Sequence, residues 1–157
     1  AEVGAVNKGV GLAATLIGAL LGGGLLARIG LSRALLLFGF LQAITNLGFW
    51  WLASHPASLV DMTVVILLEN LAGGMGTAAF VALLMGLCNP RYTATQFALL
   101  SALASVGRIW VGPAAGALAT ELDWASFFLI SVAAAVPGLI LLVRMRPWLE
   151  SAPASDR

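Results

Sequence analysis

Five long apolar stretches divide this chain of 157 residues, with only short polar connections between them. They cover residues 3–27, 34–53, 59–87, 94–119 and 125–143. A helix rises about 1.5 Å per residue, so about 20 residues are enough to cross about 30 Å of hydrocarbon. The pattern therefore predicts five membrane-spanning helices, and the short connections make consecutive helices antiparallel neighbours.

The composition indicates what surrounds this fold. Hydrophobic residues make up 61% of the chain and charged residues 10%, and the mean hydropathy is +1.00. Soluble domains carry about 25% charged residues, and a water-soluble fold of this length could not hide so much apolar surface in one core. We therefore predict an all-α, polytopic membrane protein whose solvent is lipid.

Charge and cysteine content exclude several classes of function. The formal net charge is +1, so no basic field attracts nucleic acid, and we expect no nucleic-acid partner. The single cysteine, Cys88, excludes an internal disulfide and argues against a CxxC metal or redox site. We expect no metal and no cofactor.

The ends of the chain differ from its middle. Residues 1–146 are predicted to form the membrane unit, and residues 147–157 a polar tail or linker. The chain begins Ala-Glu-Val-Gly, without an initiator methionine or a signal-peptide pattern. We expect that residues before Ala1 are missing, and we interpret the chain as a piece of a larger protein.

Positive charges alternate between successive connections. The first connection, the third connection and the segment after the last stretch hold the arginines Arg28, Arg33, Arg91, Arg144 and Arg146. The second and fourth connections contain no lysine or arginine. Because cytoplasmic loops carry an excess of positive residues, we predict a bacterial inner-membrane protein with its N-terminal end outside and its C-terminal end in the cytoplasm.

Three ionisable residues, Lys8, Glu69 and Arg108, lie within the apolar stretches. Each costs about 2.5–3.5 kcal/mol at the centre of a bilayer, so a partner or a polar route is expected. Glu69 and Arg108 lie ten and eleven residues from the outer ends of their stretches, about 15 and 16 Å deep. They could form a structural ion pair or take part in substrate or proton coupling, and Lys8 could line the path or extend to the outer headgroups.

Polar and small residues recur at intervals of three and four in three stretches, which places them on one face of each helix. These faces contain Lys8, Gly11, Thr15, Gly18 and Gly22; Glu69, Gly73 and Gly76; and Ser101, Ser105, Arg108 and Gly112. A weaker set on 34–53 contains Gln42, Thr45 or Asn46, and Phe49. We predict that the first, third and fourth helices line a cavity, and that the fifth faces lipid. The candidate residues of a substrate or proton pathway are Asn7, Lys8, Glu69, Asn70, Thr77, Gln96, Ser101, Ser105 and Arg108.

Two pairs of glycines are spaced for close helix contact. Gly18 and Gly22 form one pair, and Gly112 and Gly116, with Pro113 between them, form the other. Small residues four apart let helix backbones approach each other in a membrane. Packing is the predicted role of both pairs, with hinge flexibility as the alternative.

Two segments resemble motifs of the major facilitator carriers. The sequence GGLLARIGLSR at 23–33 is similar to the cytoplasmic loop between the second and third helices of each carrier half, with Ala27 where that family prefers aspartate. GPAAG at 112–116, followed by Trp124 and Phe127, resembles a motif that marks the fifth or eleventh helix of these carriers and the start of the next. The resemblance implies carrier helices 8–12, in the C-terminal half, and a gating loop that includes Gly23, Arg28, Gly30 and Arg33.

A closer resemblance covers nearly the whole chain. ENLAGGMGTA at 69–78 and TQFALLSAL at 95–103 are similar to the anhydromuropeptide permease family. This implies a proton-driven symporter that imports N-acetylglucosaminyl-anhydromuramyl peptides for peptidoglycan recycling in Gram-negative bacteria. In such a carrier two halves rock about a central site, in alternating access. The implied partners are the lipid bilayer, the anhydromuropeptide and a missing N-terminal half.

Other functions stay open. A major facilitator carrier of a different solute, such as a drug or an acyl-CoA, is the nearest alternative, and a helical channel or assembly subunit is another. A membrane-embedded enzyme is disfavoured because the sequence has no histidine cluster, no metal-ligand spacing and no Ser-His pairing. We therefore predict a transporter and not an enzyme.

Overall fold

The computed structural model describes the backbone of residues 2–56 and 58–151, and the side chains within them except at 2–7, 108, 114, 150 and 151. Five helices make up nearly all of these residues: α1 (Glu2–Ile29), α2 (Leu31–Ser54), α3 (Leu59–Leu87), α4 (Thr93–Glu121) and α5 (Trp124–Ser151). The described residues contain no strand, and all five helices contain a segment long and apolar enough to cross a membrane. The predicted all-α class with five spans is confirmed.

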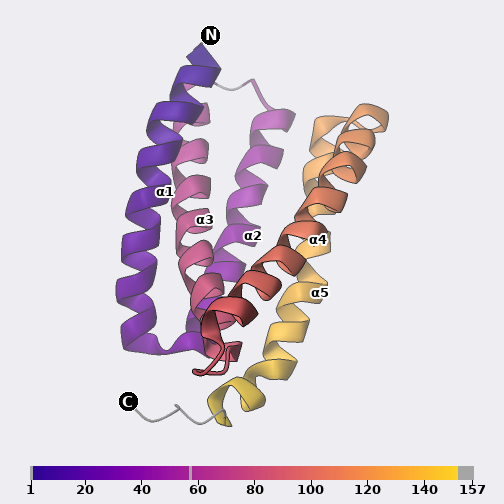
Figure 1. The fold of residues 1–157 in the computed structure, drawn as a ribbon. Coiled ribbons are helices and arrows are strands. Elements are labelled where there is room, and N and C mark those ends of the chain that lie inside the picture. The colour runs from indigo at the N-terminus through magenta and orange to yellow at the C-terminus, as the bar shows by residue number, and fades with distance from the viewer. Residues whose placement is uncertain (1, 57, 152–157) are drawn as a thin grey trace.

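The helices pack in pairs and not around one axis (Figure 1). α1 lies along α3, α2 packs against α3 on another side, and α5 runs along α2. α4 contacts α3 and α5 only slightly. α5, which was predicted to face lipid, therefore packs on α2, and α4 is the helix most exposed to its surroundings.

The α1–α3 contact depends on three glycines. A Cβ atom on Gly18 would collide with the carbonyl oxygen of Leu71, and one on Gly74 would collide with the carbonyl oxygen of Thr15. A Cβ atom on Gly22 would lie 2.6 Å from Cα of Met75. Because the obstructing atoms belong to the backbone, they cannot move aside, so only glycine permits this approach.

A small core holds α1, α2, α3 and α5 together near the α1–α2 connection. Its buried residues are Ala34, Leu35, Phe38 and Ala79. Leu25 and Leu26 of α1 and Leu142 of α5 pack against it. No described side chain of α4 or α5 is itself buried. Lipid solvates apolar side chains, so helices in a bilayer pack through contact and small residues without needing a large buried core.

Local signals determine where helices start. Ser58 and Asp61 form a capping box at the start of α3, in which Ser58 Oγ accepts from the Asp61 N–H (3.2 Å) and the Asp61 carboxylate accepts from the Ser58 N–H (2.9 Å). Gly30, with φ 83°, joins α1 to α2 in a conformation that glycine adopts without strain. The predicted connection 28–33 is thus reduced to one residue, and Arg28 and Arg33 belong to the adjoining helices.

The last helix also extends past its predicted end. Residues 147–151, which were assigned to a polar tail, continue α5 to Ser151. Pro147 lacks an N–H, which removes one helix hydrogen bond. Leu149 packs against the buried core, which keeps this turn attached to the bundle. Residues 152–157 lie outside the described residues.

Candidate functional site

α3 carries polar groups on two sides, and one side faces α1. Thr15 Oγ1 lies 3.1 Å from Asn70 Oδ1 and 2.9 Å from the carbonyl oxygen of Gly11, and its hydroxyl can donate to either. The Asn70 amide nitrogen donates to the carbonyl oxygen of Ile66 (2.8 Å). Asn70, a predicted pathway residue, therefore connects α1 to α3 between the glycine contacts.

The cavity predicted between α1, α3 and α4 does not correspond to any of the four cavities of the described residues. The polar and small face of α1 is a contact surface, because Gly11, Gly18 and Gly22 are buried. None of the four cavities described here is lined by a residue of α4. The small residues of α1 that were expected to line it instead allow α1 to pack directly on α3, and a cavity shared with α4 stays a prediction.

A cleft with a partly polar lining lies between α2, α3 and α5. It consists of two cavities of about 330 and 500 Å³. Both are lined by Leu35, Gly39, Gln42, Phe80 and Leu142. Thr77 lines the smaller cavity, and Asn46 lines the larger one. We call this space the α2–α3–α5 cleft.

The side chain of Gln42 lies over two glycines of α3. A Cβ atom on Gly76 would lie 3.0 Å from Gln42 Oε1, and one on Gly73 would lie 4.0 Å from Nε2. Gln42 lies eleven residues after Leu31 and twelve before Ser54, so it is about 17 Å from either end of α2. The side-chain amide has no hydrogen-bond partner among the described residues. A polar ligand or water can therefore bind it at mid-bilayer depth.

Glu69 lies on the same side of α3 as Gly73. Val65, one turn before it, lies against Gly48 of α2, with its Cγ1 3.1 Å from where a Cβ on Gly48 would stand. The register between α2 and α3 thus places Glu69 between the Gly48 contact and Gln42. Glu69 is half-buried and has no ion-pair partner among the described side chains.

The two cations predicted to accompany Glu69 are not seen to pair with it. The Lys8 side chain is exposed on α1. The side chains of Arg108 and Asn7 lie outside the described residues. The pairing of Glu69 with Arg108 therefore stays a prediction.

The remaining pathway candidates form local hydrogen bonds. Gln96 is in the first turn of α4, where its Oε1 accepts from the Asn89 N–H and stabilises the turn between α3 and α4. The Ser105 hydroxyl donates to the Ser101 carbonyl oxygen (2.8 Å). The Thr77 hydroxyl donates to the Gly73 carbonyl oxygen (2.8 Å), while the side chain lines the cleft. Thr77 is thus the only one of these that reaches a described cavity.

The residues assigned to gating and packing differ in their surroundings. Arg28 and Arg33 are exposed at one end of the bundle, on either side of Gly30. Gly23, also assigned to the gating loop, lies within α1 with open space around it. Of the two glycine pairs assigned to packing, Gly18 and Gly22 lie against α3. Gly112 and Gly116 have open space where a Cβ would be, and Pro113 between them is exposed.

Sequence reasoning underestimated Gln42. It placed this residue in a weak set on one helix and left it out of the pathway candidates. The available signal was an amide at the middle of an apolar stretch, one turn before the amide of Asn46, in a chain whose third stretch carries Gly73 and Gly76. What periodicity could not show is that these glycines face Gln42. Among the described residues, no group of three or more His, Cys, Asp or Glu side chains could hold a metal ion.

Comparison with known proteins gives strong matches along the whole chain. It is 56% identical over 155 residues, 99% of its length, to the anhydromuropeptide permease of Escherichia coli K12. It is 37% identical over 142 residues, 90% of its length, to the putative transporter AmpG 4 of Rickettsia conorii. It is 34% identical over 153 residues to an uncharacterized protein of Haemophilus influenzae.

These matches cover 32%, 34% and 36% of the three relatives. The chain therefore spans about a third of the length of the curated relatives that it matches. No family model matches the chain.

Proposed function

The resemblance to the anhydromuropeptide permeases is confirmed by sequence identity along nearly the whole chain, and on this basis we propose that the chain is part of a carrier that imports anhydromuropeptides. The substrates would be N-acetylglucosaminyl-anhydromuramyl peptides, taken across the bacterial inner membrane for peptidoglycan recycling. The observation that carries the proposal is the 56% identity over 99% of the chain. The five apolar helices agree with a transporter.

The activity belongs to a longer protein, because the chain spans about a third of its relatives. The proposal assigns α1 to α5 to helices 8–12 of a major facilitator carrier, on the strength of the motifs at 23–33 and 112–116. The other half of the carrier would complete the binding site. The two halves would rock against each other and expose the site to each side in turn.

The α2–α3–α5 cleft supports a role in binding a polar solute. A sugar-peptide substrate carries many hydrogen-bond donors and acceptors, and a glutamine amide can serve as both. Gln42 offers such an amide without a partner among the described residues, and Thr77 and Asn46 add a hydroxyl and a second amide to the lining. We assign substrate contacts to these three residues.

Glu69 is the proposed site of proton coupling. Its carboxyl group lies about 15 Å from the start of α3, and ionisable groups at this depth usually belong to an ion or proton pathway. A carboxyl group can gain and lose a proton, whereas an arginine stays charged. A Glu69 that is neutral in one state of the carrier and charged in the other would couple proton entry to uptake.

The orientation follows from the arginines. Arg28, Arg33 and Arg91 lie at the end of the bundle where α5 also ends. We assign this end to the cytoplasm because positive residues concentrate on that side. Import would then carry the substrate from the opposite end toward Arg28.

The test is uptake of radiolabelled anhydromuropeptide by vesicles that contain the full-length protein, with and without a proton uncoupler. We expect saturable uptake that the uncoupler abolishes and that excess unlabelled anhydromuropeptide competes. Uptake of a drug or an acyl-CoA in place of the muropeptide would reassign the substrate. A current that does not saturate would indicate a channel and overturn the carrier mechanism.

A further inference from the structure

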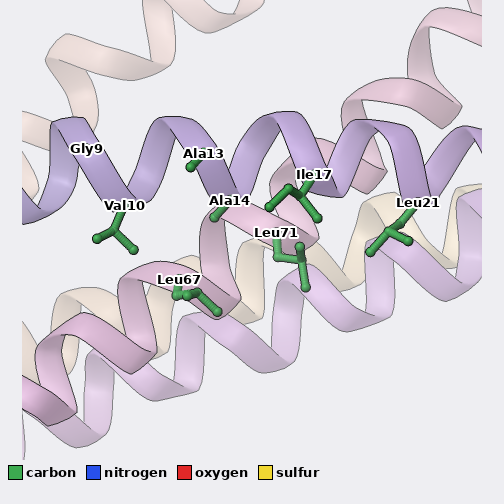
Figure 2. A pocket seen from close by; sticks show the side chains of 8 residues that line it. All are labelled: Gly9, Val10, Ala13, Ala14, Ile17, Leu21, Leu67 and Leu71. Atoms are coloured by element: carbon green, nitrogen blue, oxygen red, sulfur yellow. The ribbon is translucent and has the colours of Figure 1, made fainter.

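A groove runs along the α1–α3 pair, and none of its lining residues lines the α2–α3–α5 cleft. Its first part is a cavity of about 840 Å³ with only apolar lining residues. Figure 2 shows side chains from both helices around it, all of carbon alone. The lining includes Val10, Ala14, Ile17, Leu21, Leu67 and Leu71.

A second cavity continues this groove toward the end of α1. It has a volume of about 460 Å³, and Leu21 lines both cavities. Its lining consists of Leu20, Leu21, Gly24, Leu25, Arg28 and Met75. Positions 10, 14, 17, 21, 24 and 28 follow intervals of three and four, so they lie along one line of the helix surface. The groove is therefore continuous along α1, over about 29 Å from Gly9 to Arg28.

Arg28 is the one charged residue in the lining of the two cavities. It lies in the last turn of α1, where an arginine reaches the headgroup level of a bilayer. It is exposed and has no hydrogen-bond or ion-pair partner among the described residues. A guanidinium group matches the geometry of a phosphate and can bind it through two parallel hydrogen bonds.

We propose that this groove binds an anionic phospholipid, with its phosphate on Arg28 and one acyl chain along α1. The distance from Arg28 to Ile17 is eleven residues, about 16 Å, which equals about half the thickness of the hydrocarbon layer. One acyl chain in the leaflet next to Arg28 therefore fits this part of the groove. Gly24 provides the necessary space, because nothing lies within 4 Å of the position where its Cβ would be.

The charge at the end of the groove selects the occupant. An apolar groove alone would accept any lipid tail, but a cation between helices at a membrane surface favours an anionic headgroup. The inference does not depend on which solute the carrier moves. It therefore can fail while the proposed function holds, and it can hold if the substrate is another solute.

The first test is native mass spectrometry of the full-length protein released from vesicles of phosphatidylglycerol and phosphatidylcholine in equal amounts. We expect the wild-type protein to retain phosphatidylglycerol in preference, and Arg28→Gln to reduce this retention about tenfold. Arg91→Gln is the matched control, because it removes a positive charge at the same end of the bundle and lines neither cavity. Equal retention by Arg28→Gln and wild type, or an equal loss in Arg91→Gln, would overturn the proposal.

The second test fills the groove and keeps the charge. Gly23 and Gly24 both have open space at the Cβ position, but only Gly24 lines the cavity next to Arg28. We expect Gly24→Leu to lose retention of phosphatidylglycerol and Gly23→Leu to keep it. Addition of inorganic phosphate should not displace the lipid, because phosphate has no acyl chain to occupy the groove. Retention in Gly24→Leu equal to that in Gly23→Leu, or displacement by phosphate, would contradict the assignment of a lipid.

Discussion

Glu69 and Gln42 are polar side chains that the α2–α3 contact holds at similar depth. Gln42 lies over Gly73 and Gly76, and Glu69 precedes Gly73 by one turn. Polar groups at the centre of a bilayer are costly unless water, a ligand or another side chain satisfies them. Neither side chain has a charged or hydrogen-bonding partner among the described residues. Both are therefore free to bind a substrate, a water molecule or a proton that enters and leaves during transport.

Glu69→Gln tests the coupling role at this residue. Glutamine has nearly the same shape as glutamate but cannot release a proton, so proton-driven accumulation of anhydromuropeptide should fall by about tenfold or more, the effect of about 1.4 kcal/mol. Exchange of labelled for unlabelled substrate, which needs no net proton movement, should persist. Both are measured in vesicles with the full-length protein, and Glu121→Gln at the end of α4 is the control. Unchanged accumulation would remove Glu69 from the coupling mechanism.

Gln42→Leu tests the substrate contact. Leucine fills a similar volume but leaves the polar groups of the bound substrate unpaired, which costs about 1–3 kcal/mol. The KM for uptake should rise about tenfold, while the amount of folded protein should not decrease because leucine suits the apolar stretch. Thr45→Val is the control, since the Thr45 hydroxyl donates to the backbone carbonyl oxygen of Gln42 (3.0 Å) and lines neither cavity of the cleft. A KM that Gln42→Leu leaves unchanged would place the substrate elsewhere.

Among the described helices, α1 and α3 form the most extensive contact. Gly18, Gly22 and Gly74 bring the two backbones together, and Thr15 and Asn70 add a hydrogen bond between the helices. Hydrogen bonds between helices in membranes contribute about 0.6 kcal/mol on average. The close backbone contact is therefore expected to contribute more to this pairing than the hydrogen bond does.

Gly74→Leu should separate α1 from α3. The new side chain would meet the carbonyl oxygen of Thr15, which cannot shift without moving the helix, so we expect a loss of about 3 kcal/mol or more in the free energy of unfolding. Gly86→Leu on the same helix is the matched control, because nothing lies within 4 Å of its Cβ position. Thermal unfolding of the full-length protein in detergent measures both. Equal melting temperatures for the two variants would show that the helices do not touch as described.

The start of α5 should respond to acid. Hydrogen bonds from the Ser126 hydroxyl and backbone N–H hold the pKa of the Asp123 carboxyl below its usual value. A lowered pKa in the folded state means that the stabilisation is complete above the usual value, about pH 4, and is lost as the pH falls through the lowered one. Asp123→Asn should therefore be less stable than wild type at neutral pH, with a difference that shrinks in acid. Thermal unfolding across this range is the measurement, and a difference independent of pH would contradict the assignment.

The elements were more predictable than their partners. Apolar length alone located all five helices, and residues 59–87 match α3 because a capping serine and an asparagine-proline turn bound that stretch. Helix pairing was not predictable, because Gly18 with Gly22 and Gly112 with Gly116 have the same spacing, yet only the first pair lies against another helix. Glu69 and Thr77 were selected from the sequence; Thr77 lines the α2–α3–α5 cleft, and the role of both residues stays a prediction. The cleft was missed because its walls depend on which face of α2 meets α3.

α4 is the most loosely packed of the five helices, and its exposed faces are expected to contact other parts of the full-length protein. The chain spans about a third of its relatives, and α4 carries Ser101, Ser105 and two unopposed glycines on a helix with no buried described side chain. A polar and small face of this kind is costly against lipid and suited to another helix. We expect the remaining part of the full-length carrier to cover it, which agrees with the proposed two-half architecture.

The orientation of the chain in the membrane is predicted by the charges of all its connections together. His55 lies between α2 and α3, Arg91 lies between α3 and α4, and both are exposed at opposite ends of the bundle. Because the arginines gather at the end that holds Arg91, the positive-inside rule assigns this end to the cytoplasm. In a full-length protein with Cys88 replaced by serine, an impermeant maleimide added to spheroplasts should label His55→Cys nearly completely and Arg91→Cys hardly at all. After the membrane is opened, Arg91→Cys should react as fully as His55→Cys, which controls for reactivity. Labelling of Arg91→Cys in sealed spheroplasts with protection of His55→Cys would show the opposite orientation. The Arg28 end of the α1–α3 groove would then lie in the outer leaflet.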